Sequence, residues 1–237
     1  MSQQPLLNLE KVNTHIDQFH ILQNVNFTVK KGELTLLLGR NGAGKTTTLR
    51  TIIGLNPPTK GRVMFNGEDI SAIPPYKIAK KGIGYVPEDQ GIFYDLTVGE
   101  NMRVAMMKED DATQKRLESS LELFPDLKKF WKKPGGQLSG GQKQMLSIAR
   151  AFVNETDLLL IDEPSKGLAP VIVEKVIEAI EKIKEHTTVV LVEQNFYMAK
   201  RLGDRFYILD DGLSVHEGYM NELDENEELK RKYLGIG

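Results

Sequence analysis

The sequence contains no cysteine, only four histidines and a single tryptophan in 237 residues. The absence of cysteine excludes disulfides, thiolate zinc sites, iron–sulfur clusters and a cysteine nucleophile. The histidines do not have metalloprotease spacing, which argues against a histidine-built metal site. Neither sign of charge dominates, because 31 Lys and Arg stand against 33 Asp and Glu. This balance provides no overall basic surface, and we expect no nucleic-acid partner.

Long apolar runs are also missing. No stretch approaches the roughly 20 apolar residues that span a bilayer. The segment Met1–Pro5 lacks the cationic and apolar regions of a signal peptide. We therefore expect a cytoplasmic chain that reaches a membrane only through a partner. A hydrophobic content of 40% with 27% charged residues is typical of a globular protein with a buried core.

Short apolar runs of strand length alternate with segments of helical periodicity. The helices are expected at Lys45–Leu55 and Val171–Glu185. Alternation of this kind predicts an α/β protein with a mostly parallel sheet covered on both faces. The predicted sheet strands are Leu34–Leu38, Leu158–Ile161, Val189–Val192 and Phe206–Leu209.

Two segments depart from this alternation. Near the N-terminus, the patterns predict a small antiparallel β subdomain, whose strands are Leu6–Val12, Ile21–Val29 and Arg62–Phe65 before an Asn-Gly turn. Residues 90–155 lack strand patterns and predict an inserted helical subdomain. Its expected helices are Val98–Met107, Thr113–Phe124 and Gln142–Phe152. We expect one domain over residues 1–237 that contains this helical insertion.

The strongest motif follows the first predicted sheet strand. Residues 39–46, Gly-Arg-Asn-Gly-Ala-Gly-Lys-Thr, match the phosphate-loop pattern G-x-x-x-x-G-K-[ST] at every fixed position. Its glycines let backbone N–H groups surround phosphate oxygens at the start of a helix. Lys45 can reach the β- and γ-phosphates, and the hydroxyl of Thr46 can bind Mg²⁺. The candidate nucleotide-binding residues here are Gly39, Arg40, Asn41, Gly42, Ala43, Gly44, Lys45, Thr46 and Thr47.

A second chemical motif is the apolar strand that ends in Asp162 and Glu163. The carboxyl ends of parallel strands are where ligands bind. Asp162 can hold Mg²⁺ through water, and Glu163 can polarise the water that attacks the γ-phosphate. Two solvated acids at a strand end are the alternative interpretation.

The segment Leu138–Gln142 reads Leu-Ser-Gly-Gly-Gln. Ser139 and Gln142 have the spacing of a helix capping box. A capping box does not explain Gly140 and Gly141, because glycine in a first helical turn costs up to about 1 kcal/mol relative to alanine. Close approach of an anion to exposed N–H groups explains both glycines.

Together, the phosphate loop, this segment and the strand ending in Asp-Glu resemble the ATP-binding subunit of ABC transporters over nearly the whole chain. The resemblance implies an ABC ATPase fold around a P-loop NTPase core, with ATP and Mg²⁺ as ligands. It also implies two subunits paired head to tail. In such a pair, Ser139, Gly140, Gly141 and Gln142 of one subunit would face the γ-phosphate held by the other. Two transmembrane permease subunits, at the cytoplasmic face of the membrane, and indirectly a solute-binding protein, are further implied partners.

Three positions depart from the general ABC pattern. Most ABC subunits carry glutamine where Glu88 stands, histidine where Gln194 stands and aspartate where Ala169 stands. Glu88 can still accept a metal-bound water, which makes it a third candidate metal ligand beside Thr46 and Asp162. Gln194 can donate to a γ-phosphate oxygen but cannot become cationic, and it joins Glu163 as a catalytic candidate. Either these residues are normal for one branch of the family, or they leave hydrolysis mainly to a different ATP-binding subunit.

The branch is indicated by the segments 85–88, 162–170 and 192–195, which are similar to the second ATP-binding subunit of branched-chain amino-acid importers. Urea-type importers look alike. We therefore expect an ATPase that energises import of branched-chain or related amino acids, with a different or an identical ATPase partner. A regulatory or assembly module with little hydrolysis is the alternative. A DNA-repair or translation ATPase is disfavoured, because the chain has no second cassette and no long coiled coil.

Several side chains keep two interpretations. The adenine-stacking position of the family aligns with Ile16, and His15 or Phe19 can substitute, but Phe19 is equally well explained as a core residue of its strand. Met102, Met106 and Met107 fit either a partner groove or the core. Trp131 is expected to pack at a solvated helix end, and residues 222–232 to form a charged surface helix.

Overall fold

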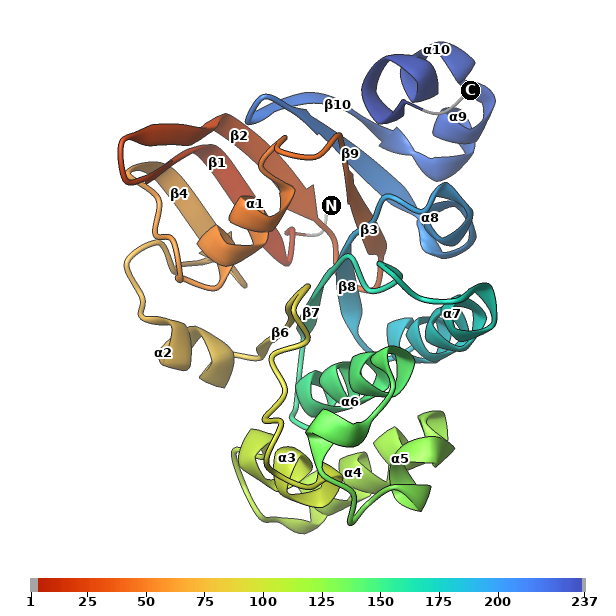
Figure 1. Ribbon diagram of the computed structural model, residues 1–237. Coiled ribbons are helices and arrows are strands. Elements are labelled where there is room, and N and C mark those ends of the chain that lie inside the picture. Colours follow the sequence, from red (N-terminus) through yellow and green to blue (C-terminus); the bar gives the residue numbers. More distant parts are fainter. Residues whose placement is uncertain (1–3, 236–237) are drawn as a thin grey trace.

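The computed structural model describes residues 4–235 and contains two sheets (Figure 1). The larger sheet is six-stranded; its five strands from β9 to β6 are parallel, and β10 is antiparallel at one edge. In spatial order the strands are β10 (Leu213–Tyr219), β9 (Arg205–Asp210), β3 (Leu34–Leu38), β8 (Thr188–Val192), β7 (Leu158–Asp162) and β6 (Ile83–Val86). The predicted mostly parallel sheet is therefore confirmed.

The N-terminal sheet is antiparallel, as predicted, and its strand order is β2-β1-β4-β5. Its strands are β1 (Leu7–Ile16), β2 (Phe19–Val29), β4 (Lys60–Phe65) and β5 (Glu68–Asp69). Asn66 and Gly67 make the turn between β4 and β5, both with positive φ (50° and 78°), as an Asn-Gly hairpin turn requires.

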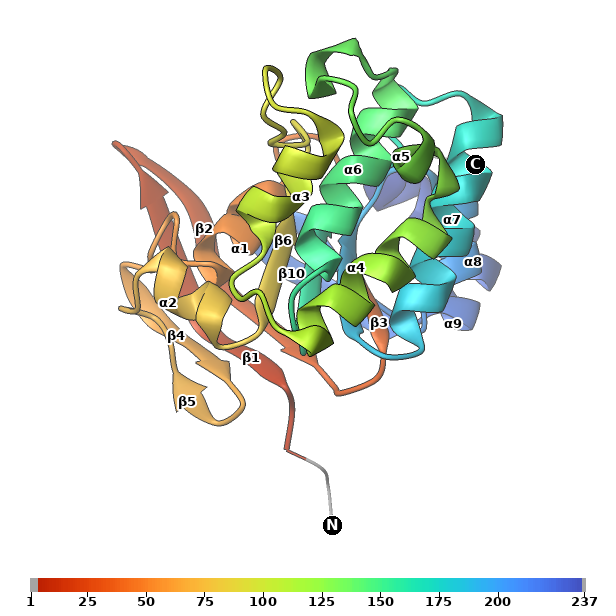
Figure 2. The same ribbon diagram turned by 90° about the horizontal axis from the view of Figure 1, so that it is seen from below.

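Helices cover the larger sheet on one face, and the antiparallel sheet with α1 covers the other (Figures 1 and 2). The helices outside residues 98–152 are α1 (Lys45–Ile52), α2 (Pro75–Lys80), α7 (Pro170–Lys184), α8 (Phe196–Leu202), α9 (Met220–Glu225) and α10 (Glu227–Leu229). Residues 98–152 carry α3 (Val98–Ala105), α4 (Asp111–Leu123), α5 (Pro125–Lys129), a 3₁₀ turn (Gly135–Gln137) and α6 (Gly140–Phe152). These last helices gather at one end of the molecule, beyond β6 and β7 (Figure 1).

The core strands are buried on both faces, which is why they read as continuous apolar runs. In β7, Leu159 and Ile161 pack in the cluster that contains α6 and α7, whereas Leu158 and Leu160 pack with α1 and the antiparallel sheet. All five residues of β7 are buried. The end of β7 therefore delivers Asp162 and Glu163 from a rigid interior strand.

Several local predictions were wrong. Phe19 is 60% exposed at the start of β2, so it is not a core residue. Residues 222–232 are not one surface helix: α9 ends at Glu225, α10 is separate, and residues 230–234 form a π-helical turn. Leu223 in this region is fully buried. The helix predicted over Lys45–Leu55 ends at Ile52, and β6, β10 and α2 were not predicted.

The structure also shows where the three methionines and Trp131 lie. Met102 is fully buried in the core and Met106 packs against it, whereas Met107 is 50% exposed. Trp131 packs against the core and against Gly99, where an added Cβ would lie 2.6 Å from the indole. Among residues 4–235, no helix combines the length and the apolar character needed to cross a membrane.

Candidate active site

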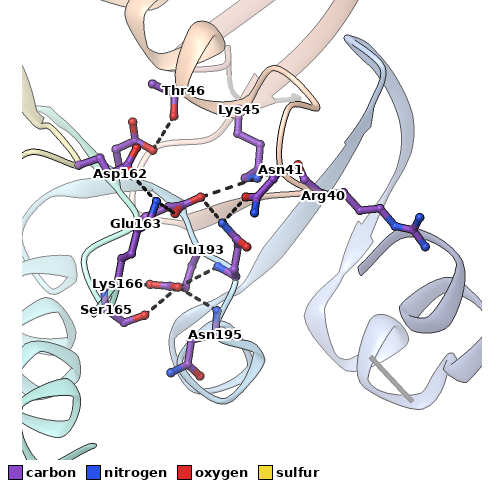
Figure 3. Close-up of polar contacts among 12 residues, drawn as sticks. Arg40, Asn41, Lys45, Thr46, Asp162, Glu163, Ser165, Lys166, Glu193 and Asn195 are labelled. Carbon is purple, nitrogen blue, oxygen red and sulfur yellow. Dashed lines mark hydrogen bonds and ion pairs between the residues drawn. The ribbon is translucent and has the colours of Figure 1, made fainter. Parts of the chain in front are cut away.

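The phosphate loop connects the end of β3 to the start of α1 (Figure 3). Gly44 stands just before α1 with φ 100°, and a Cβ there would lie 2.8 Å from Cδ2 of Leu22. Gly39 has φ 141°, and its Cβ would lie 2.3 Å from the carbonyl oxygen of Leu209. No side chain caps α1 and no acid stands in its first turn. The positive end of α1 is therefore available to an anion such as a phosphate.

Lys45 is buried within this loop, with 5% of its surface exposed. Its Nζ donates to the carbonyl oxygens of Gly39, at 2.9 Å, and Arg40, at 3.0 Å. The same nitrogen lies 3.8 Å from Oε1 of Glu163. Burial lowers the pKa of Lys45, and the surrounding carboxylates, Glu163 first, oppose that effect. The ammonium is held at the centre of the loop and close to the end of β7.

Asp162 is completely buried. The hydroxyl of Thr46 donates to its Oδ1 at 3.2 Å, and the hydroxyl of Tyr85 donates to its Oδ2 at 3.3 Å. Burial raises the pKa of Asp162 to about 6. The structure therefore brings together two of the oxygen ligands predicted for Mg²⁺, from the start of α1 and the end of β7.

Glu163 has a left-handed backbone conformation, with φ 45°, and its N–H donates to the carbonyl oxygen of Val192 at 2.9 Å. Its side chain is 8% exposed. Oε1 accepts a hydrogen bond from Nε2 of Gln194 at 2.5 Å, and Nε2 also lies 2.8 Å from Oδ1 of Asn41. The structure thus joins both catalytic candidates, Glu163 and Gln194, to the phosphate loop.

Glu193 is a buried residue of this site to which sequence reasoning gave no role. Its Oε1 accepts from the hydroxyl of Ser165 and from the N–H groups of Gln194 and Asn195, each at 2.8 Å. Burial raises the pKa of Glu193 and these donors oppose that rise. The carboxylate fixes the turn that carries Gln194 against the turn that follows Glu163 (Figure 3). The only sequence signal was its position between the end of a buried strand and Gln194.

Among the described residues, Glu88 makes no hydrogen bond to Thr46 or Asp162. Its carboxylate makes an ion pair with the ammonium of Lys166, which also lies 3.7 Å from Oε2 of Glu163. Within residues 4–235, no group of three or more His, Cys, Asp or Glu side chains is arranged to hold a metal ion.

The Leu138–Gln142 segment begins α6, and the predicted capping box is present. The N–H of Gln142 donates to the hydroxyl of Ser139 at 3.3 Å, and the N–H of Ser139 donates to Oε1 of Gln142 at 3.0 Å. Packing gives a second reason for glycine at position 141, because a Cβ there would lie 2.5 Å from Cγ2 of Ile172. At Gly140 an added Cβ would meet nothing within 4 Å. Gly140 is the glycine that packing leaves unexplained.

Within the described chain, no hydrogen bond or ion pair connects residues 139–142 to residues 39–47. Arg40 also points away from the acidic residues (Figure 3), and its Nη2 donates to the carbonyl oxygen of Lys232 at 3.0 Å.

The adenine candidates lie on the β1–β2 hairpin. Ile16 is 37% exposed and Phe19 is 60% exposed. His15 is stacked on His20, with ring centroids 4.2 Å apart. The hairpin lies beside the phosphate loop, since Gly44 is packed against Ile21 and Leu22.

A glycine loop between a buried strand and a helix, with Lys45 and Thr46 facing acids at the end of a parallel strand, defines a P-loop nucleoside triphosphatase. The model of the ABC transporter family matches residues 22–166. The chain belongs to this family: it is an ABC transporter ATP-binding subunit, an ATPase that binds ATP.

Three relatives illustrate the range of the family. The high-affinity branched-chain amino acid transport ATP-binding protein BraG of Pseudomonas aeruginosa is 40% identical over 232 residues, covering 97% of this chain and all of BraG. The probable branched-chain amino acid transport ATP-binding protein LivF of Archaeoglobus fulgidus is 37% identical, covering 98% and 99%. The lipopolysaccharide export system ATP-binding protein LptB of Escherichia coli is 33% identical, covering 91% of each chain.

Solved structures agree on the fold. A nucleotide-free ATP-binding cassette from an ABC transporter superposes with a TM-score of 0.85 at 23% identity, over 99% of this chain and all of that chain. An ATP-binding cassette solved as a dimer in a post-hydrolysis state, bound to ADP and Pi, superposes with a TM-score of 0.80 at 28% identity, over 90% and 98%.

Proposed function

We propose that this chain energises an importer of branched-chain or related amino acids. The support is the identity of 40% to BraG and 37% to LivF over nearly full length. LptB, at 33%, serves lipopolysaccharide export, so membership of the family does not by itself define the cargo. In this proposal the chain docks on two transmembrane permease subunits at the cytoplasmic face of the membrane, and a solute-binding protein delivers the amino acid.

The observation that carries the catalytic part of the proposal is the placement of Glu163. This carboxylate is buried, lies 3.8 Å from Nζ of Lys45 and accepts a hydrogen bond from Gln194. Lys45 and the N–H groups of residues 39–47 bind the phosphates of ATP. Glu163 then orients the attacking water and accepts its proton, and Gln194 holds the Glu163 carboxylate in that position.

The residues present fit a magnesium ion. Thr46 and Asp162 supply a hydroxyl and a buried carboxylate oxygen, which are the hard ligands that Mg²⁺ prefers. Thr46 and Asp162 would hold the ion, and when bound it neutralises charge on the β- and γ-phosphates.

The head-to-tail dimer is also part of the proposal. Residues 139–142 start α6 with a glycine-rich first turn in which Ser139 and Gly140 are exposed, and in their own subunit they make no hydrogen bond or ion pair to the phosphate loop. We propose that Ser139, Gly140, Gly141 and Gln142 face the γ-phosphate bound by a second ATP-binding subunit, with the backbone N–H groups of α6 as donors. A different partner ATPase is favoured over an identical one, because Gln194 and Ala169 replace the usual residues of the family.

The same two residues favour the second candidate function, a nucleotide-dependent regulatory or assembly module with little hydrolysis. The two candidates differ in the turnover of the assembled complex. A urea- or amide-type importer differs instead in its solute, which the solute-binding protein determines.

The test is to purify a tagged copy of the chain from detergent-solubilised membranes of its own cell and to identify its partners by mass spectrometry. The importer proposal requires two multi-span proteins and a second ATP-binding subunit. Recovery of cytoplasmic partners alone from intact membranes would contradict it. Single-turnover hydrolysis by the recovered complex is then compared with that of Glu163→Gln. This variant is expected to bind ATP but to hydrolyse it at least about 100-fold more slowly.

A further inference from the structure

Lys166 occupies an unusual position between two acids from different turns. It follows the end of β7, whereas Glu88 follows the end of β6. The ammonium of Lys166 pairs with the carboxylate of Glu88 and lies 3.7 Å from Oε2 of Glu163. Oε1 of Glu163, on the other side of the carboxylate, lies 3.8 Å from Nζ of Lys45. Each oxygen of Glu163 therefore faces a different lysine.

The two lysines have different exposure and different further partners. The Lys45 side chain is 4% exposed and donates to two loop carbonyls, whereas the Lys166 side chain is 60% exposed. When the phosphates of ATP arrive, they compete with Glu163 for Lys45, because Lys45 is the cation of the phosphate loop. Lys166 is then the cation that remains with Glu163. Without Lys166, Lys45 would be the one lysine left near three carboxylates and the negative phosphates. These carboxylates are Asp162, Glu163 and Glu88.

A long, exposed lysine holds one conformation only when a partner fixes it, because its free side chain has many rotamers. Glu88 provides that partner, and its own side chain is 39% exposed. An isolated ion pair between two side chains as exposed as Lys166 and Glu88 would contribute little to stability. This ammonium, however, also faces Glu163, whose side chain is 8% exposed, so its position acts on a buried group.

We propose that Lys166 is a positioning residue that holds the carboxylate of Glu163 for attack on the γ-phosphate, and that Glu88 anchors Lys166. This inference rests on the proposed role of Glu163. It gives Glu88 a task other than binding metal and explains why an acid suits a position where most ABC subunits carry glutamine. The acid and the lysine form a complementary pair within this one chain.

The test measures kcat and KM for ATP of the complete membrane complex carrying Lys166→Met, Lys166→Arg, Glu88→Gln or the double variant Glu88→Gln/Lys166→Met. Lys166→Met is expected to lower kcat about tenfold and to change KM less than about twofold, since a misplaced catalytic group affects the transition state and not nucleotide binding. Lys166→Arg, which keeps the charge, is expected to retain about half of kcat or more.

The double variant tests the anchor. If Glu88 acts through Lys166, Glu88→Gln lowers kcat about threefold in the natural background and has no further effect once Lys166 is methionine. Lys175→Met is the matched control, because Lys175 is 50% exposed and pairs with Asp126 on the helical side of the molecule. Its kcat is expected to equal that of the unmodified complex.

Each contrary outcome identifies what fails. Unchanged kcat in Lys166→Met, with Glu163→Gln inactive in the same assay, overturns the role of Lys166 and leaves the proposed function intact. Equal effects of Glu88→Gln in both backgrounds overturn the anchor. An unchanged rate in Glu163→Gln overturns the proposed mechanism and this inference together.

Discussion

Nε2 of Gln194 donates a hydrogen bond to Oε1 of Glu163 over 2.5 Å. The same nitrogen lies 2.8 Å from Oδ1 of Asn41 in the phosphate loop. A primary amide carries two N–H donors, so one side chain can satisfy both acceptors. The glutamine at this position therefore connects the carboxylate proposed to be catalytic to the phosphate loop.

The first prediction concerns this connection. Gln194→Ala is expected to lower kcat about tenfold, because a hydrogen bond to a charged group contributes about 1.5–3 kcal/mol. Gln194→His is expected to leave kcat unchanged or to raise it, since imidazole still presents an N–H donor. The measurement is steady-state ATP hydrolysis by the assembled complex, with Gln114→Ala on the exposed face of α4 as control. A Gln194→Ala complex with unchanged kcat would remove Gln194 from the mechanism, and collapse in Gln194→His would show that the amide itself is required.

The second prediction concerns stability and pH. The pKa of Asp162 is raised by burial from 3.8 to about 6. Between these values the folded protein binds more protons than the unfolded chain, so its free energy of unfolding falls as pH rises. Asp162→Asn cannot lose this proton. It is therefore expected to be more stable than the natural protein by about 2–3 kcal/mol at pH 7, with the difference vanishing below about pH 4.

The measurement is urea unfolding of the isolated subunit from pH 4 to 8 in the presence of EDTA and without nucleotide. Carboxylates distant from Asp162 titrate alike in both proteins, so the difference curve reports Asp162 and the groups that interact with it, Glu163 and Glu88. A difference that does not change with pH would contradict the raised pKa.

The third prediction concerns the base of ATP. Phe19 is 60% exposed on β2, the strand whose Ile21 and Leu22 pack against Gly44 of the phosphate loop, so it can stack on adenine without a role in the core. Phe19→Ala is expected to weaken ATP binding about three- to tenfold, as loss of an aromatic contact of about 0.5–1.5 kcal/mol does, while stability stays within about 0.5 kcal/mol. The dissociation constant is measured in the Glu163→Gln background to prevent turnover. Tyr76→Ala, with Tyr76 62% exposed on α2, is the control. Unchanged affinity would exclude Phe19 and leave His15 and Ile16 as the candidates for the contact.

The sequence was informative where local pattern and chemistry coincide. The phosphate loop and Asp162-Glu163 follow buried strands whose apolar runs are visible without any partner. It was less informative where a neighbour distant in the chain decides. Strand β6 is short and contains Gly84, and only pairing with β7 makes it a strand. Strand β10 is a mostly exposed edge strand without an apolar run.

The same limit applies to side chains of the site. Glu193 gains its role from Ser165, and Lys166 from Glu88, which is 78 positions away. Gly141 is the sharpest example, because the side chain that requires it belongs to Ile172 on another helix. A motif can therefore be recognised correctly while the sequence alone misses one of the physical reasons for a residue in it.

The fourth prediction separates the two causes within this motif. Gly141→Ala is expected to destabilise the isolated subunit by about 1–3 kcal/mol, because the new Cβ would lie 2.5 Å from Cγ2 of Ile172 and overpack the contact. Gly140→Ala meets nothing within 4 Å and replaces glycine by the best helix former. Its stability is therefore expected to stay equal or to rise by up to about 1 kcal/mol.

The effect on kcat should not follow the effect on stability in these two variants. If α6 presents its first turn to the γ-phosphate of a second subunit, Gly140→Ala lowers kcat of the assembled complex at least about tenfold although the subunit is fully stable, because the added methyl group obstructs the anion. Gly141→Ala/Ile172→Ala is the companion variant. It should recover stability relative to Gly141→Ala, since the Cγ2 atom that clashes is gone. A Gly140→Ala complex with natural kcat would mean that no phosphate approaches this turn, and the head-to-tail dimer would lose its support.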